Sequence, residues 1–199
     1  MSEIGLKFHC NWIQEEPMGA KFLEELNLWR DKLYDAGLIG VYPNGIGYGN
    51  VSIRCEQNHF VITGTATGQY KKLVPEHYTK VTEYNLLKNS LTTVGPIKAS
   101  SESLTHAVIY ECDKNANAVI HVHHLGLWKR LIYKVPTTNK TVEYGTPAMA
   151  NEVIRLFKET NLSEERILVM AGHEEGIVAF GKNLAEAGDK ILGELKILT

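Results

Sequence analysis

The order of the apolar segments is the feature that most constrains the fold of this chain. The expected strands are clustered along the sequence, whereas regular β–α units would separate them one by one with helices. These expected strands are 51–55, 59–63, 78–84, 117–124, 166–171 and 176–180. The expected helices are 17–40, 101–113, 146–160 and 183–198. Clustered strands flanked by helices predict an α+β layer fold.

The helical segments carry apolar residues at helical spacing. In 17–40 these include Leu26, Trp29 and Leu33, and Gly37 is placed to end the helix. In 183–198 they include Leu184, Ala187, Ile191, Leu192 and Leu195. Each of these helices therefore has one apolar face to bury.

Length and composition fit one ordinary domain over residues 1–199, because 199 residues with 44% hydrophobic side chains can bury a core of their own. No repeat, low-complexity tract or linker interrupts the sequence. The formal net charge is −2, and no Lys/Arg-rich run is present. This balance argues against a nucleic-acid surface or an anionic-membrane patch, so any bound anion needs a local pocket.

The cysteines and the apolar runs predict a cytoplasmic protein. Cys10, Cys55 and Cys112 are odd in number and far apart, so neither a disulfide framework nor a zinc ribbon is indicated. The first residues lack the pattern of a signal peptide, and no segment approaches the ~18 uninterrupted apolar residues of a membrane span. We expect no membrane association.

Three histidines end the apolar segment 117–124. Side chains two positions apart on a strand share a face, so His121 and His123 point the same way and His124 points to the other face. A lone histidine at a strand end is usually solvated or hydrogen-bonded. A pair on one face is a candidate chelate, and His124 is outside it.

Further ligands must come from elsewhere, because a catalytic metal centre needs about three protein ligands and an open position. Glu102 lies at the start of the expected helix 101–113, and His173 follows the expected strand 166–171. Taken alone, such a glutamate is ordinarily a helix cap and such a histidine is ordinarily solvated. Together with His121 and His123 they form a set of three histidines and one carboxylate.

Two glycine-rich stretches, 47–52 and 63–69, have the composition of anion cradles. Glycine lets backbone N–H groups approach a ligand, and hydroxyl and amide side chains bind phosphate oxygens. The same residue types are also common in tight turns. Ser100 and Ser101 add two hydroxyls beside Glu102, although Ser101 is also a candidate helix cap. Neither stretch matches a nucleotide-binding loop.

Five motifs follow one another along the chain: GNVS, VITGTATG, SSE, ANAVIHVH and a histidine before GIVAFG. In this order they resemble the class II aldolase/adducin family. The nineteen residues from Glu102 to His121 add specificity to the match, which runs from about Gly47 to about Gly188. The family includes metal-dependent aldolases of fuculose and rhamnulose phosphates, a ribulose-phosphate 4-epimerase, a methylthioribulose-phosphate dehydratase and adducin head domains.

The resemblance implies a three-layer α/β/α fold with a central, mostly antiparallel sheet, in a homotetramer with sites at subunit interfaces. It implies that Zn²⁺, or Mn²⁺, Co²⁺ or Fe²⁺, is bound by His121, His123 and His173. Glu102 either completes the metal shell or is displaced by substrate and acts as general base. The residues implied to line the substrate phosphate pocket are Asn50, Thr67, Gly68, Ser100 and Ser101.

The expected activity is that of a metal-dependent class II aldolase-type lyase, which cleaves a short phosphorylated ketose through a metal-stabilised enediolate with Glu102 as acid/base. A first alternative is dehydration of methylthioribulose 1-phosphate, with which the spacing of Glu102 and His106 is compatible. A second is a non-catalytic, adducin-like binding domain. The 4-epimerase is least favoured, because the epimerases have Asp in place of Glu102.

Some positions differ from the usual pattern of the aldolases. Gly47 and Tyr48 stand where a hydroxyl residue and a serine are usual, so a phosphate contact is lost or Tyr48 reshapes the pocket. The segment 63–68 is longer than usual, so Thr63 and Thr65 compete with Thr67 for the phosphate contact.

Two further departures concern acid/base groups. The stretch after His123 is shorter than in the aldolases, where it carries a tyrosine proton donor, and Tyr133 is one candidate for that role. GHEEG places Glu174 and Glu175 between His173 and Gly176. These carboxylates are either partners of the metal ligands, a substituted acid/base, or solvated charge.

Overall fold

The computed structural model describes residues 8–56 and 58–198. Its main element is an eight-stranded sheet in the order β1-β7-β6-β5-β4-β8-β10-β9, antiparallel except for the β1–β7 pair. The strands of this sheet are β1 (His9–Ile13), β4 (Asn50–Glu56), β5 (His59–Thr63), β6 (Tyr78–Asn85), β7 (Ser90–Val94), β8 (Ala118–His123), β9 (Ile167–Val169) and β10 (Gly176–Gly181). The short strands β2 (Gly40–Val41) and β3 (Gly47–Tyr48) form a separate antiparallel pair.

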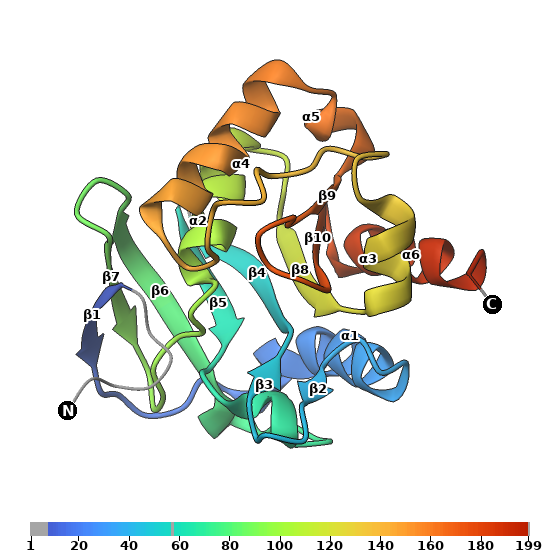
Figure 1. Cartoon of the computed structure of the whole chain (residues 1–199). Coiled ribbons are helices and arrows are strands. Elements are labelled where there is room, and N and C mark those ends of the chain that lie inside the picture. The colour runs from blue at the N-terminus through green and yellow to red at the C-terminus, as the bar shows by residue number, and fades with distance from the viewer. Residues whose placement is uncertain (1–7, 57, 199) are drawn as a thin grey trace.

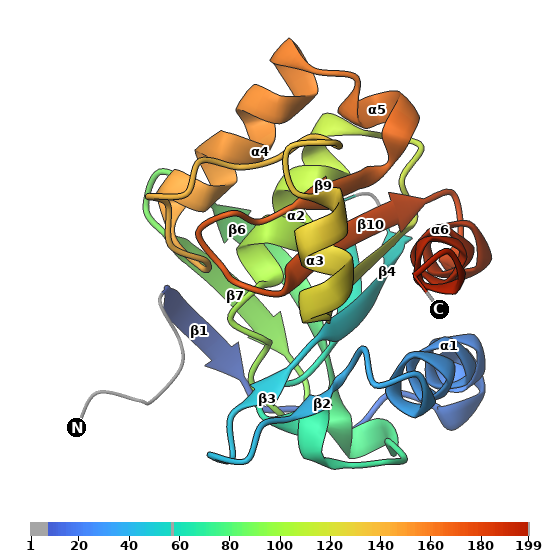
Figure 2. The same ribbon diagram turned by 45° about the vertical axis from the view of Figure 1, so that its right-hand side comes forward.

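Helices cover both faces of the sheet (Figure 1, Figure 2). The α-helices are α1 (Glu24–Asp35), α2 (Ser103–Cys112), α3 (Leu125–Leu131), α4 (Pro147–Glu159), α5 (Leu162–Glu165) and α6 (Leu184–Lys196). Three short 3₁₀ helices are η1 (Ala20–Leu23), η2 (Thr67–Gln69) and η3 (Pro75–His77). Helices α2 and α4 pack on one face, and α1, α3 and α6 pack on the other. The predicted mixed α/β fold with a mostly antiparallel central sheet is confirmed.

Strand β8 shows how the two cores are separated. Its side chains alternate between faces, so Val119 joins the core under α2 and α4, whereas Ile120 and Val122 join the core under α1 and α6. By the same alternation His121 and His123 lie on the α2 side. The helix pair on the other face packs closely, because a Cβ atom on Gly188 of α6 would lie 2.3 Å from the ring of Trp29 in α1.

Several elements were not expected from the sequence. Strands β1 and β7 pair at the sheet edge, where polar residues alternate with apolar ones and reduce the hydrophobic signal. Helix α3 spans only Leu125–Leu131, too short for a clear period, and it is capped by His124 instead of a usual capping residue. Ser101 was one candidate for the N-cap of the expected helix 101–113. In the structure the N-cap residue of α2 is Glu102, and its side chain makes no capping hydrogen bond.

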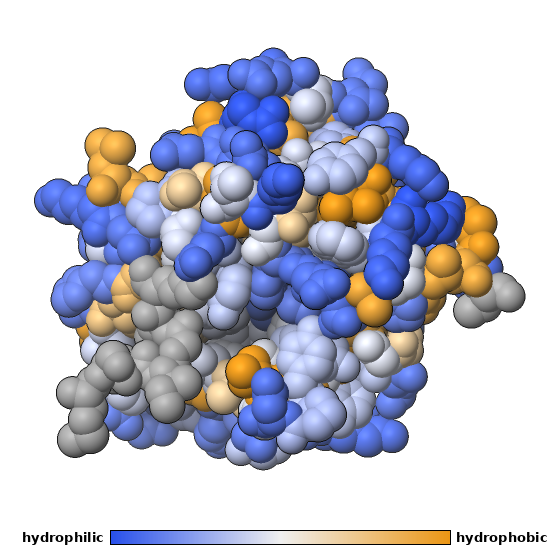
Figure 3. Space-filling model, viewed as in Figure 1, coloured by the Kyte–Doolittle hydropathy of each residue, from blue (hydrophilic) through white to orange (hydrophobic). Residues whose placement is uncertain are grey.

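The face of the molecule seen in Figure 3 is largely polar. Figure 3 shows hydrophilic side chains over most of one face, with apolar groups in separate patches between them. Over the described ranges, no helix combines the length and apolar character that crossing a membrane requires.

Candidate active site

Three histidines form a cluster at the end of the central strands. His121 and His123 come from β8, and His173 comes from the loop between β9 and β10. One potential ligand atom from each of the three lies within 4.8 Å of the others. The ring centroids are 4.8 Å apart for His121 and His123, 5.5 Å for His121 and His173, and 4.6 Å for His123 and His173. The loop therefore brings the distant third histidine onto the face that strand parity selects.

Burial keeps the two β8 imidazoles neutral. Burial, together with the nearby His173, lowers the pKa of His123 to about 3. Burial also lowers the pKa of His121 well below its ordinary value, with His123 and His173 adding to the effect. A neutral imidazole has a lone pair to give, and Nε2 of His121 is buried without a hydrogen-bond partner among residues 8–56 and 58–198. This set of donors fits a divalent transition metal.

Glu102 lines the same cavity as the cluster but is not one of the three grouped ligands. Its side chain is buried at the start of α2, and one carboxylate oxygen accepts a hydrogen bond from the Thr105 hydroxyl at 2.9 Å. The carboxylate is thereby held in one orientation beside the histidines.

The two glycine-rich loops meet beside the cluster, as the β2–β3 hairpin and η2 pack together. A Cβ atom on Gly68 would lie 2.1 Å from the carbonyl oxygen of Gly40, so only glycine allows this approach. Thr67 donates its hydroxyl to the Gly64 carbonyl at 2.9 Å. The hydroxyl of Thr67 is therefore used to shape the loop.

Asn50 and Ser100 connect the loops to the histidines. Asn50 pairs with His121 across β4 and β8, and its Nδ2 donates to the Ser100 hydroxyl oxygen at 3.0 Å. Since that oxygen accepts a bond, the Ser100 O–H proton can be directed at a ligand. The buried Oδ1 of Asn50 has no hydrogen-bond partner within the described ranges. The site thus offers an acceptor and a donor side by side.

All of these groups line one cavity of about 470 Å³. Every predicted site residue lies on it: Asn50, Thr67, Gly68, Ser100, Ser101, Glu102, His121, His123 and His173. Thr65 and Tyr48 also line it, whereas Thr63 lies beneath, with its hydroxyl oxygen accepting the Val51 N–H at 3.3 Å. No lysine or arginine of the described ranges lines this cavity.

Sequence reasoning missed two tyrosines of this cavity. The Tyr144 ring lies 4.1 Å from that of His173, and Tyr42 contacts His123. Both are single aromatic residues in irregular segments, and no sequence pattern marks them. Tyr133, considered as a proton donor, is 70% exposed and lines a different surface hollow. Within one chain, it does not reach this cavity.

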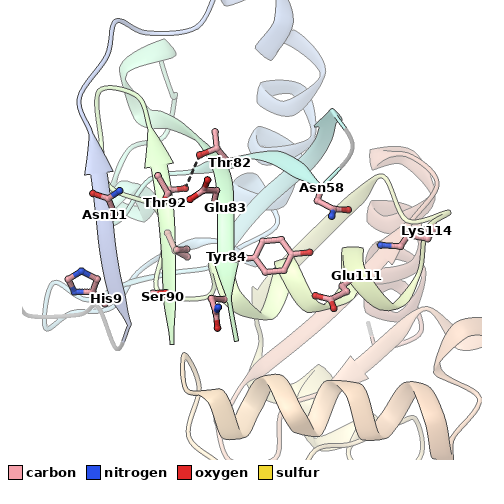
Figure 4. A pocket seen from close by; sticks show the side chains of 12 residues that line it. His9, Asn11, Asn58, Thr82, Glu83, Tyr84, Ser90, Thr92, Glu111 and Lys114 are labelled. Atoms are coloured by element: carbon pink, nitrogen blue, oxygen red, sulfur yellow. Dashed lines mark hydrogen bonds between the residues drawn. The ribbon is translucent and has the colours of Figure 1, made fainter. Parts of the chain in front are cut away.

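A second, more open cavity of about 620 Å³ lies at the β1–β7–β6 edge. Figure 4 shows its polar side chains spread along the strands and α2, including His9, Asn11, Glu83, Tyr84 and Glu111. Among the described residues, the group of side chains with metal-ligand geometry lies in the other cavity.

Comparison with known proteins identifies the family of the chain. A family model described as "Class II Aldolase and Adducin N-terminal domain" matches residues 43–192, which contain all the predicted site residues. Among curated proteins, none matches the sequence.

Solved structures share the fold at low sequence identity. The L-fuculose-1-phosphate aldolase from Thermus thermophilus is 22% identical with a TM-score of 0.65, and the match covers 90% of this chain and 92% of that one. YgbL from Escherichia coli, a putative aldolase/epimerase/decarboxylase, is 16% identical with a TM-score of 0.67, covering 90% and 87%. A sugar-phosphate aldolase from Thermotoga maritima is 17% identical with a TM-score of 0.66, covering 89% and 93%.

Proposed function

Because the chain belongs to the class II aldolase and adducin N-terminal domain family, we propose that it is a metal-dependent lyase that cleaves a short phosphorylated ketose. The products are dihydroxyacetone phosphate and an aldehyde. The observation that carries this proposal is the union, in one cavity, of three clustered histidines, the carboxylate of Glu102 and two glycine-rich loops.

His121, His123 and His173 are the proposed metal ligands. A divalent cation held there supplies Lewis-acid polarisation of substrate oxygens, which lowers the free energy of the negative charge that develops during cleavage. Zn²⁺ is the preferred candidate, and Mn²⁺, Co²⁺ and Fe²⁺ are alternatives, since all accept imidazole nitrogen.

Glu102 is the proposed acid/base residue. Its carboxylate lies in the same cavity, and Thr105 holds one of its oxygens. The other oxygen can take up or return the substrate proton as the carbon–carbon bond breaks.

The substrate phosphate is proposed to lie against the loops that carry Thr67, Gly68, Ser100 and Ser101. Because no lysine or arginine of the described ranges lines the cavity, neutral hydroxyl and backbone N–H donors bind the phosphate. The unpartnered Oδ1 of Asn50 accepts a hydrogen bond from a substrate hydroxyl. Such an acceptor suits a sugar derivative better than an apolar ligand.

The alternative activity, dehydration of methylthioribulose 1-phosphate, would use the same site. Product analysis distinguishes it from carbon–carbon cleavage. His106, whose spacing from Glu102 is compatible with that reaction, is fully buried against Ser52 and does not line the cavity. The structure thus gives this alternative no additional group. We further propose that residues 1–199 form one domain and that the chain assembles as a homotetramer with sites at subunit interfaces.

The test is turnover of a panel of ketose 1-phosphates, including L-fuculose 1-phosphate, by wild-type protein and Glu102→Gln. We expect the wild-type protein to release dihydroxyacetone phosphate and the variant to be slower by a factor of roughly 10²–10⁴, the usual contribution of a general acid/base. Water loss with an intact carbon chain would favour dehydration. Equal rates for both proteins would refute the role of Glu102.

A further inference from the structure

Tyr42 joins a histidine of the cluster to a carboxylate. Its hydroxyl lies 2.8 Å from Nδ1 of His123 and donates a hydrogen bond to Oε2 of Glu175 at 2.5 Å. The three residues come from the β2–β3 hairpin, from β8 and from the loop between β9 and β10. This contact therefore connects three segments that are distant in the sequence.

The direction of each hydrogen bond follows from the number of protons. A phenol has one proton, and an ionised carboxylate can only accept, so the phenol proton points to Glu175. The separation of 2.5 Å between the phenol oxygen and Oε2 of Glu175 is that of a hydrogen bond donated by a hydroxyl to a carboxylate. The remaining bond must then run from the Nδ1–H of His123 to the phenol oxygen. His123 is left with its lone pair on Nε2.

We propose that Tyr42 and Glu175 are positioning residues that fix the tautomer and ring orientation of His123 for metal binding. This inference rests on the metal centre of the proposed function. A carboxylate that acts through a hydrogen-bonded group on a ligating histidine raises the basicity of the imidazole and reduces its freedom to rotate. Neither residue touches the substrate in this role.

Backbone hydrogen bonds hold Glu175 in place. The carbonyl of Glu175 accepts the N–H of His124 at 3.1 Å, and the N–H of Gly176 bonds to the carbonyl of His173 at 2.9 Å. Glu175 has φ of +71°, a left-handed conformation that costs a non-glycine residue roughly 1–2 kcal/mol. A strained residue kept in a loop between buried strands is consistent with a positional requirement.

Tyr42 is held in a similar way. Its N–H bonds to the carbonyl of Ile46 at 2.9 Å, and its carbonyl accepts the N–H of Gly45 at 2.8 Å. Its ring also packs 4.5 Å from that of Tyr48. The GHEEG segment, with two residues between His173 and Gly176, thus brings the carboxylate of Glu175 to the Tyr42 hydroxyl.

The experiment compares Zn²⁺ and Co²⁺ affinity in four variants, namely Tyr42→Phe, Glu175→Gln, the double variant and the matched control Glu174→Gln. Glu174 is the exposed neighbour of Glu175, so its variant makes the same charge change outside the contact. Competition with a chromophoric chelator gives the affinities, and the visible spectrum of bound Co²⁺ reports the ligand geometry. Circular dichroism of the metal-free proteins checks that each variant is folded.

We expect Tyr42→Phe to weaken metal binding by a factor of roughly 10–100, the usual effect of losing such a partner, and to alter the Co²⁺ spectrum. Glu175→Gln should weaken binding less, because a glutamine oxygen still accepts the phenol proton. In the Tyr42→Phe background, Glu175→Gln should have little further effect. Glu174→Gln should leave the affinity unchanged.

Each contrary result has a separate meaning. Wild-type affinity in Tyr42→Phe, or additive effects of the two substitutions, would overturn the positioning role. Metal binding with the expected variant pattern, but without ketose phosphate cleavage, would refute the proposed function and leave the positioning role intact. A wild-type protein that binds none of these metals would overturn both.

Discussion

The fully buried His106 gives the stability of this protein a specific dependence on pH. Its Nδ1 lies 2.7 Å from the Ser52 hydroxyl, which lies 2.7 Å from the Tyr110 hydroxyl, and no carboxylate is among these partners. Burial lowers the pKa of His106 to about 3. In the unfolded chain its pKa returns to about 6.5.

The sign and size of the effect follow from linkage. Below pH 6.5 the unfolded chain binds a proton at His106 that the folded chain does not bind. The contribution of neutral His106 to the free energy of unfolding is therefore fully present above that pH and is lost as the pH falls toward 3. At pH 5 the gap of about 1.5 pH units corresponds to about 2 kcal/mol of lost unfolding free energy relative to pH 7.

The perturbation is His106→Asn, which removes the titrating group and keeps a side chain able to bond the Ser52 hydroxyl. Urea unfolding of the metal-free wild-type protein and variant is measured at pH 7 and pH 5. We expect the variant to be less stable at pH 7, but its loss between the two pH values to be about 2 kcal/mol smaller than that of the wild-type protein. Equal losses in both proteins would refute the reasoning.

Three further substitutions test helix capping, close packing and a buried hydrogen-bonding side chain. His124→Ala should leave metal stoichiometry unchanged and cost about 1 kcal/mol in urea unfolding, because His124 caps the first turn of α3. Gly188→Ala should cost roughly 1–3 kcal/mol in the same assay, because its Cβ would overlap the Trp29 ring; wild-type stability would refute the close packing. Arg30→Met should cost roughly 2 kcal/mol, because the buried guanidinium bonds two carbonyls of 67–71; thermal melting that matches the wild-type curve would refute this.

The parts of the fold that were predictable are those with strong local patterns. The apolar strand β8 and the amphipathic helices α4 and α6 carry their periodicity in sequence. The pairing of β1 with β7 was not predictable, because it depends on residues about eighty positions apart at a half-polar sheet edge. Short α3 lacked both a usual cap and enough turns to reveal a period.

The candidate site was predictable to a similar degree. Strand parity placed His121 and His123 on one face, and the structure has both on the cavity. The proximity of Glu102 and His173 required long-range information, which came from the ordered motifs of the family. The contact between Tyr42 and Glu175 had no signal, because it joins two irregular loops whose separation only the folded chain sets.

The central claim is that this cavity is a metal-dependent carbon–carbon lyase site. Its most direct test is release of dihydroxyacetone phosphate from ketose 1-phosphates by one protein preparation as purified, after removal of metal with a chelator, and after readdition of Zn²⁺ or Co²⁺. The account predicts cleavage that disappears with the metal, returns with it, and is absent in His121→Ala. Cleavage by metal-free protein, or no cleavage by protein with a full equivalent of bound metal, would contradict it.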